Sequence, residues 1–285
     1  MKPSEIIVLG SNGQLGKELV KIYPEARAVD KTELDLTDYK ATAAFNWSDT
    51  KVIINAAAYT NVDGAESSQG RVDAWKINAT AVANLAKIAI SHKIILVHIS
   101  TDYVFNGQNQ NHREDEPLSP LSVYGQSKAA GDIAASMASQ HYIIRTSWVM
   151  GEGKNFVKTI VELANNGISP TVVTDQIGRP TFTETIVEAI DFLLRENAPF
   201  GTYNLSNEGN PVSWADLARK TFELAGFKNT KVLDISTKAY YKERQNVAPR
   251  PLNSLLDLSK IESLGYKPID WELSLNRYLR TECTS

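Results

Sequence analysis

Four short runs of aliphatic residues are spaced along the first half of the chain, and amphipathic stretches separate them. Nearly every position in these runs is apolar, rather than every second one, which is typical of strands buried on both faces of a parallel sheet. Helices between the strands would cover both faces. The pattern therefore predicts an α/β fold with a doubly wound parallel sheet. The four runs are EIIVLG (5–10), KVIINAAA (51–58), IILVHIS (94–100) and YIIRTSW (142–148).

The pattern changes after about residue 150, where helical periodicity dominates and Pro- and Gly-containing connections join the helices. Ser213 is placed to cap the third of these helices and Gly226 to end it. We expect one domain over residues 1–150 and a smaller, mostly helical domain over residues 151–285, with some segments of the second returning to the first. The helical patterns are NFVKTIVELANNG (155–167), TETIVEAIDFLLREN (183–197) and SWADLARKTFELAG (213–226).

Composition and charge exclude several classes of protein. The net charge of −3 gives no electrostatic basis for binding nucleic acid or an anionic membrane, and no apolar run approaches the roughly 20 residues of a spanning helix. The N-terminus lacks the features of a secretory signal. The one cysteine, Cys283, permits no intrachain disulfide, and four scattered histidines give no zinc-type cluster. We expect a cytoplasmic protein.

A glycine turn, GSNGQLG (10–16), follows the first strand and opens the first helix. Small residues at Gly10, Gly13 and Gly16 would let the chain turn tightly and let its backbone approach a pyrophosphate, which the helix N-terminus attracts. Asp30 ends the next apolar run, where an acid would bind the adenosine ribose. This arrangement predicts a Rossmann-type dinucleotide-binding domain.

The residues near Asp30 leave the choice of cofactor open between NADH and NADPH. The Asp30 carboxylate would repel a 2′-phosphate, whereas Lys31 would neutralise it. Asp35 and Leu36 lie either beside the adenine or in a helix-capping turn. Three alanines end the strand at 51–58 and leave room for the cofactor. The residues expected to bind it are Gly10, Asn12, Gly13, Gln14, Leu15, Gly16, Asp30, Lys31, Asp35, Leu36, Ala56, Ala57, Ala58, Tyr124 and Lys128.

Tyr124 and Lys128 lie four residues apart in VYGQSK, so a helix would place them on one face. Thr101 ends the strand at 94–100, at the ligand edge of the sheet. Reduction of a carbonyl needs a hydride at carbon and a proton at oxygen. Tyr124 would donate that proton, with the Lys128 ammonium lowering the pKa of the phenol, and Thr101 would bind the substrate oxygen. The pair alone would also suit an ordinary amphipathic helix.

The Thr–Tyr–x–x–x–Lys set and the glycine turn resemble the extended short-chain dehydrogenase/reductase superfamily. STDYVFNG, IIRTSWVMG, VVTDQIGRPT and RPLNSLLDLSKIESLGY are similar to the dTDP-4-dehydrorhamnose reductase family, nearly end to end. This resemblance implies reduction of the 4-keto group of a dTDP-sugar by NADH or NADPH. Tyr103 stands where dehydratases carry a glutamate base, which disfavours dehydration. Another nucleotide-sugar reductase, an epimerase or a non-catalytic regulatory subunit remain alternatives.

The resemblance also implies the substrate contacts. The residues that would line the sugar are Thr101, Asp102, Tyr124, Lys128 and Trp148, although Trp148 could instead be a core aromatic. Arg179 and Arg250 would bind the diphosphate or lie solvated at the surface. Some relatives bind Mg²⁺ through glutamates at a homodimer interface. Glu18, Glu184 and, less well, Glu282 match those positions, although lone glutamates are usually solvated. A homodimer and a magnesium site are therefore hypotheses.

Overall fold

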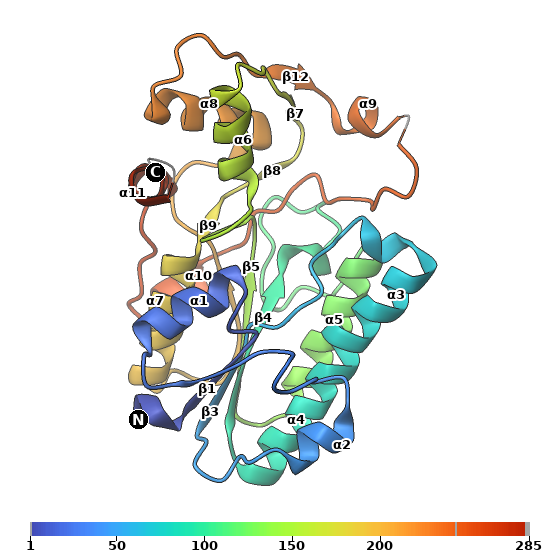
Figure 1. Ribbon diagram of the computed structural model, residues 1–285, viewed down its shortest axis with the longest axis vertical. Helices are drawn as coiled ribbons and strands as arrows, with labels where there is room; N and C mark the ends of the chain where they lie inside the picture. The colour runs from blue at the N-terminus through green and yellow to red at the C-terminus, as the bar shows by residue number, and fades with distance from the viewer. Residues whose placement is uncertain (1, 243, 283–285) are drawn as a thin grey trace.

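A computed structural model of the protein describes residues 2–242 and 244–282. A sheet of six parallel strands forms its centre, in the order β10-β5-β4-β3-β1-β2 (Figure 1). The order reverses beside β1, which is the ligand-binding position in such sheets. The predicted doubly wound sheet is confirmed. Its strands are β1 (Ile6–Leu9), β2 (Arg27–Val29), β3 (Val52–Asn55), β4 (Ile95–Thr101), β5 (His141–Thr146) and β10 (Gly201–Leu205).

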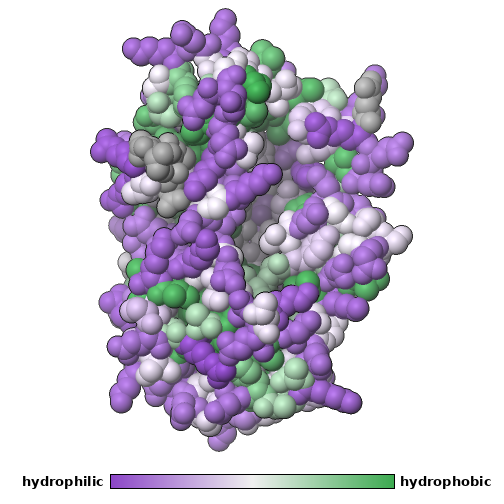
Figure 2. All heavy atoms as spheres, in the orientation of Figure 1, coloured by the Kyte–Doolittle hydropathy of each residue, from purple (hydrophilic) through white to green (hydrophobic). Residues whose placement is uncertain are grey.

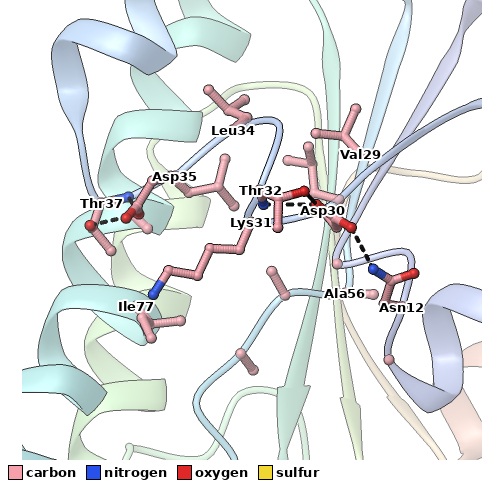
Figure 3. Close-up of a pocket in the computed structure, with 17 residues that line it drawn as sticks. Asn12, Val29, Asp30, Lys31, Thr32, Leu34, Asp35, Thr37, Ala56 and Ile77 are labelled. Atoms are coloured by element: carbon pink, nitrogen blue, oxygen red, sulfur yellow. Dashed lines mark hydrogen bonds between the residues drawn. The ribbon is translucent and has the colours of Figure 1, made fainter.

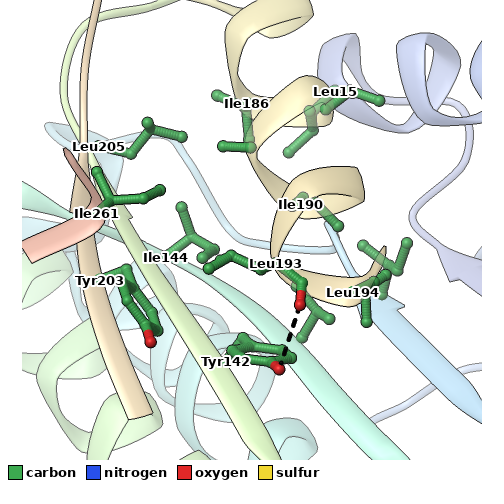
Figure 4. Close-up of a cluster of buried hydrophobic side chains, with 14 of the residues drawn as sticks. Leu15, Tyr142, Ile144, Ile186, Ile190, Leu193, Leu194, Tyr203, Leu205 and Ile261 are labelled. Carbon is green, nitrogen blue, oxygen red and sulfur yellow. Dashed lines mark hydrogen bonds between the residues drawn. The ribbon is translucent and has the colours of Figure 1, made fainter. Parts of the chain in front are cut away.

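Helices cover both faces of the sheet, with α1, α7 and α10 on one face and α2 to α5 on the other (Figure 1). Two clusters of buried residues lie accordingly against the sheet, one on each face. In the first cluster, Leu15 of α1 and Ile190 of α7 pack toward Ile144 of β5 (Figure 4). These helices are α1 (Gln14–Ile22), α2 (Tyr39–Ala44), α3 (Ser68–Trp75), α4 (Ala81–His92), α5 (Val123–Ser136), α7 (Thr183–Arg195) and α10 (Ser259–Ser263).

Residues from the second half of the chain complete the central sheet. Strand β10 pairs with β5, and α7 packs on α1. Tyr142 of β5 donates a hydrogen bond to the carbonyl of Ala198, at 2.6 Å, in the turn that leads into β10. The first domain is therefore not built from residues 1–150 alone.

The remaining C-terminal segments form a smaller region above the carboxyl ends of the strands (Figure 1). Its helices are α6 (Phe156–Asn165), α8 (Trp214–Ala225), α9 (Thr237–Tyr241) and α11 (Trp271–Glu282). As expected, Ser213 caps α8, and Gly226 ends it in the left-handed conformation. Three two-stranded sheets join these helices: β6 (Val149–Met150) with β9 (Thr181–Phe182), β7 (Thr171–Val173) with β12 (Leu233–Ile235), and β8 (Ile177–Gly178) with β11 (Val212–Ser213).

The short helical turns lie around the loops of the sheet: η1 (Pro3–Glu5), η2 (Gly64–Glu66), the π-helical turn η3 (Lys76–Thr80) and η4 (Asp102–Val104). Among the described residues, no helix is long and apolar enough to cross a membrane. The face shown in Figure 2 is mostly hydrophilic and is hollowed near its centre, between the C-terminal region and the sheet domain.

Candidate active site

The glycine turn brings β1, α1 and the strand end after β3 into close contact. Gly10 has φ +76°, and a Cβ there would lie 2.7 Å from the backbone of Ala57. A Cβ on Gly16 would lie 2.1 Å from the carbonyl oxygen of Gly10. Gly13 is the N-cap of α1, and no side chain caps this helix. The first-turn N–H groups of α1 are thus available to an anion, as the predicted cofactor site requires.

A pocket of about 360 Å³ opens beside this turn, between the ends of β1, β2 and β3 (Figure 3). Ten of the sequence-predicted cofactor residues line it, together with Thr32, Leu34 and Ile77. The ten are Gly10, Asn12, Gly13, Asp30, Lys31, Asp35, Leu36, Ala56, Ala57 and Ala58.

Asp30 lies at the edge of this pocket with its carboxylate held by neighbours. It accepts hydrogen bonds from the backbone N–H and the hydroxyl of Thr32, at 2.7 and 2.6 Å, and from the Asn12 amide at 2.5 Å. These hydrogen bonds lower the pKa of Asp30. The Lys31 side chain extends across the pocket toward Ile77 (Figure 3). Both groups therefore face the same pocket. The Asp30 carboxylate would repel a 2′-phosphate and the Lys31 ammonium would attract it.

Five predicted cofactor residues do not line the pocket: Tyr124 and Lys128, which belong to the catalytic cluster, and three residues of the glycine turn and α1. The side chain of Leu15 is buried in the core, so only its backbone is available to a cofactor. Gly16 serves the close packing of α1 on the turn. Gln14 donates from its amide to the carbonyl of Lys154, at 3.1 Å. Asp35 lines the pocket and also accepts two hydrogen bonds from Thr37, so both sequence interpretations apply to it.

The three predicted catalytic residues meet where β4 ends against the first turns of α5. Ser122 caps α5 by accepting from the N–H of Gly125 at 3.1 Å. Tyr124 and Lys128 are both buried, at 9% and 2% exposure. The Lys128 ammonium donates to the carbonyl of Ile99 in β4, at 2.5 Å. Thr101, at the end of the same strand, lies close enough to the Tyr124 phenol to influence its pKa.

Burial is the main influence on the pKa of Tyr124 in the chain itself. Burial and the charge of Asp102 raise the pKa of this phenol, whereas the Thr101 hydrogen bond opposes the rise. The expected lowering of this pKa by the Lys128 ammonium and the cationic nicotinamide concerns the complex with the cofactor, and it stays a prediction. Burial lowers the pKa of Lys128 to about 8. At neutral pH, the phenol is therefore protonated and the lysine is charged.

Asp102 lies beside this pair and is 2% exposed. Thr101 donates its hydroxyl to the Asp102 carboxylate at 3.0 Å. Burial raises the pKa of Asp102 to about 6, against the hydrogen bonds of the Ser254 and Thr101 hydroxyls. The Tyr103 ring contacts the Tyr124 ring edge-on, with 5.6 Å between centroids. The site thus combines a neutral phenol, a hydroxyl and a carboxylate that titrates near neutrality.

Trp148 follows β5 at the boundary between the two regions. Its φ of +48° is uncommon for a bulky residue, and such strain often marks a functional position. Its indole stacks on Trp214 at 3.7 Å between centroids. A Cβ on Gly178 would lie 2.8 Å from the Trp148 ring, so that position must remain small. Trp148 is thus a packed, partly buried aromatic, and its contact with a sugar stays a prediction.

The structure places the two predicted arginines differently. The Arg250 guanidinium donates to the Asp63 carboxylate at 2.9 Å. Its positive charge opposes the rise that burial causes in the pKa of Tyr103, and the Tyr103 ring contacts Tyr124. Arg250 also lines an open pocket of about 520 Å³ with Arg244 and Tyr241. Arg250 is therefore near the catalytic residues.

Arg179 instead donates to the carbonyl of Leu256 at 3.1 Å, and the charges that act on it are those of Glu262, Glu208 and Asp257. The Arg179 side chain thus hydrogen-bonds the segment that leads into α10.

The magnesium hypothesis is not supported. Glu18 is paired with Lys21 at 3.2 Å, and Glu184 lies 3.9 Å from Arg277. The side chain of Glu282 lies outside the described residues. Within the part of the chain that is described, no group of three His, Cys, Asp or Glu side chains is arranged to hold a metal ion. The two glutamates already have cationic partners.

Sequence reasoning missed Asn78, which lies in a π-helical turn between α3 and α4. Its amide donates to Ser127 on α5 and to the carbonyl of Tyr59, each at 3.0 Å, and its carbonyl group accepts from the Tyr59 N–H at 2.8 Å. The sequence in this region reads as one uninterrupted helix. The available signal in the sequence was Asn78 itself, a polar residue among alanines. The π-helical turn is seen in the structure, and such turns often mark functional sites.

Comparison with known proteins gives one consistent result. The profile of the RmlD substrate binding domain family matches residues 4–283. A dTDP-4-dehydrorhamnose reductase of Aggregatibacter actinomycetemcomitans is 38% identical, with 95% of this chain and 97% of that protein covered.

Two solved structures are also similar. A dTDP-4-dehydrorhamnose reductase from Clostridium acetobutylicum is 34% identical with a TM-score of 0.89, covering 96% of this chain and 98% of that one. The enzyme of that name from Bacillus anthracis, in complex with NADP, is 35% identical with a TM-score of 0.87, covering 96% and 97%.

Proposed function

Because the chain belongs to the RmlD substrate-binding domain family, we propose that it reduces the 4-keto group of dTDP-4-dehydro-L-rhamnose to give dTDP-L-rhamnose. The observation that carries this proposal is the buried cluster of Thr101, Tyr124 and Lys128 at the carboxyl edge of the sheet, beside a dinucleotide-type glycine turn. The nearly full-length similarity to proteins named for this reaction supports the choice of substrate.

The pocket beside the glycine turn fits a nicotinamide dinucleotide. The close approach at Gly10, the uncapped start of α1 and the carboxylate of Asp30 each match one part of it. When bound, the reduced cofactor supplies the hydride to C4 of the sugar. Since Lys31 and Asp30 both face the pocket, either NADH or NADPH fits, and the NADP in the related structure supports NADPH.

Tyr124 completes the reduction by donating its phenolic proton to the ketone oxygen. Its raised pKa keeps that proton in place until charge develops on the oxygen. The Thr101 hydroxyl, within hydrogen-bonding reach of the phenol, binds the same oxygen and stabilises its negative charge. Lys128 supplies the positive charge that stabilises the phenolate left behind.

The nucleotide part of the substrate lies, in this proposal, toward Arg250 and the pocket it shares with Arg244. Two guanidinium groups there match a diphosphate in charge and in hydrogen-bonding geometry. Asp102 would contact the sugar from the side of the sheet, and Trp148 would contact it from the side of the C-terminal region. Arg179, held in the segments around α10, is a weaker candidate for the diphosphate than Arg250.

The test compares Tyr124→Phe with Tyr203→Phe, which also removes a hydroxyl from a buried ring but lies in β10. Purified protein is mixed with NADPH or NADH and the 4-keto nucleotide sugar, and loss of reduced-nicotinamide absorbance is followed. Tyr124→Phe should lower kcat by a factor of about 10²–10⁴ and leave cofactor affinity little changed, whereas the Tyr203 variant should remain active.

Three outcomes would contradict the proposal. Near-normal turnover by Tyr124→Phe would remove Tyr124 as the proton donor. A wild-type protein that interconverts sugar isomers without consuming cofactor would be an epimerase. A protein that binds cofactor and turns over no keto sugar would have a non-catalytic role.

A further inference from the structure

A buried ion pair lies behind the catalytic helix and has no role in the chemistry described so far. Arg145 of β5 donates from Nε to the Asp132 carboxylate at 3.0 Å, and the two side chains are 6% and 3% exposed. The guanidinium also donates to the carbonyl of Glu114 at 3.1 Å. Its carbon lies 5.1 Å from the centroid of the Phe105 ring. Such a pair is costly to bury, and its contribution to stability is weak grounds for its presence.

The position of Asp132 on α5 connects this pair to the catalytic residues. Tyr124, Lys128 and Asp132 are spaced at i, i+4 and i+8, which places them along one face of the helix. All three are buried against the sheet. Asp132 is thus one turn from Lys128, with Arg145 on its other side. One carboxylate oxygen of Asp132 accepts from Arg145, and the other has no hydrogen-bond partner among the described residues.

The charged and titratable groups around Lys128 come from α5, β4 and β5. On β4, His98 is fully buried, and burial holds its pKa well below the usual value, so it is neutral. Arg145 on β5 is the second cation beside Asp132. Burial lowers the pKa of the Lys128 ammonium, and the negative charge of Asp132 opposes that effect. Arg145 is not among the groups that act on Lys128.

We propose that Asp132 is a positioning residue for the reduction, in which its carboxylate, secured by Arg145, keeps the Lys128 ammonium protonated beneath Tyr124. Burial raises the pKa of Asp132, and the charge of Arg145 opposes that rise, so Arg145 favours the ionised carboxylate and fixes its orientation. The proposal rests on the proposed function insofar as Lys128 acts in catalysis. The charge state of Lys128 itself is measurable without substrate.

The experiment uses two variants, because Asp132→Asn alone leaves a buried, unpaired Arg145 and risks unfolding the chain. The double variant Asp132→Asn/Arg145→Met removes both charges and keeps the side-chain volumes close. The variant Asp132→Glu retains the carboxylate. Each folded protein is labelled with ¹³C-lysine, and the titration midpoint of the Lys128 Cε signal, assigned with Lys128→Arg, is followed by NMR.

The wild-type midpoint should lie near pH 8. Loss of a neighbouring buried charge should lower it by about one pH unit or more in the double variant, and Asp132→Glu should keep it near the wild-type value. Because activity requires charged Lys128, kcat/KM of the double variant should fall about fivefold relative to wild type at pH 8 and change little at pH 6.

An unchanged Lys128 midpoint in the double variant would overturn the proposal, as would a loss of kcat/KM that is equal at every pH, which is the signature of a purely structural role. These results are separable from failure of the proposed function. A wild-type protein that turns over no keto sugar contradicts the function, whereas the NMR midpoint still reports whether Asp132 controls Lys128.

Discussion

Gly131→Ala tests whether the catalytic geometry depends on the close contact between α5 and the π-helical turn. Gly131 lies three residues after Lys128, where α5 packs on η3. A Cβ at this position would be 2.2 Å from the backbone carbonyl oxygen of Asn78. Carbon and oxygen atoms essentially never approach closer than 3.0 Å in this way, so the two elements must separate by about 0.8 Å.

Two opposing effects decide the stability of this variant. Alanine favours a helix interior by about 1 kcal/mol relative to glycine. Overpacking typically costs about 1–3 kcal/mol. The free energy of unfolding should therefore fall by no more than about 2 kcal/mol, and the protein should remain folded. The displacement moves Tyr124 and Lys128 and disturbs the Asn78–Ser127 hydrogen bond, and a misplacement of this size can cost up to about 10²-fold in rate.

The variant should therefore lose about 10- to 100-fold in kcat with only a small change in the denaturation midpoint. Ser136→Ala is the matched control, because it adds helix propensity at an exposed position of the same helix. Turnover is followed by reduced-nicotinamide absorbance, and unfolding by circular dichroism in urea. A Gly131→Ala protein with wild-type kcat would refute the argument that the contact with Asn78 fixes the catalytic pair.

Two further predictions concern charges at the site. Asp102→Asn should stabilise the folded chain at pH 7.5 but not at pH 4, as thermal unfolding would reveal, while lowering activity. In the wild-type chain the folded pKa of Asp102, about 6, lies above its unfolded value, so the free energy of unfolding falls by up to about 3 kcal/mol as pH rises from about 4 through 6. Equal stabilisation by Asp102→Asn at both pH values would contradict this reasoning. Lys31→Ala should weaken NADPH binding by about tenfold and leave NADH binding unchanged, measured by fluorescence titration, because its ammonium faces the pocket where a 2′-phosphate would lie; equal weakening of both would show that Lys31 does not discriminate.

The strands of the first half could be predicted because each is a continuous apolar run followed by a turn. Val52–Asn55 falls within the expected segment, Ile95–Thr101 extends one residue beyond it, and α8 has the expected cap and stop. The three two-stranded sheets could not be predicted, because strands of two or three residues have no periodicity to detect. Strand β10 was missed because its place in the central sheet depends on pairing with β5, which is distant in sequence.

The candidate site was predictable where residue spacing carries the chemistry, as for Tyr124 and Lys128 on one helical face. The site was not predictable where the burial of a side chain decides its pKa or its partner. No pattern in the sequence measures how deeply Tyr124 is buried, so the rise that burial causes in its pKa could not be predicted. The partnership of Asp132 with Arg145 and the cationic partners of Glu18 and Glu184 arise from tertiary packing, which no local pattern records.

The position of β10 at the edge of the central sheet has a consequence for synthesis of the chain on the ribosome. About 55 residues separate the end of β5 from the start of β10, so at roughly 5–20 residues per second β5 remains an open edge for about 3–11 s after it emerges. During that interval the nascent sheet exposes unpaired backbone groups and the aliphatic face that α7 will later cover. Cotranslational chaperone contact is therefore expected to concentrate on this window, and fragments that end before Gly201 should be prone to aggregate.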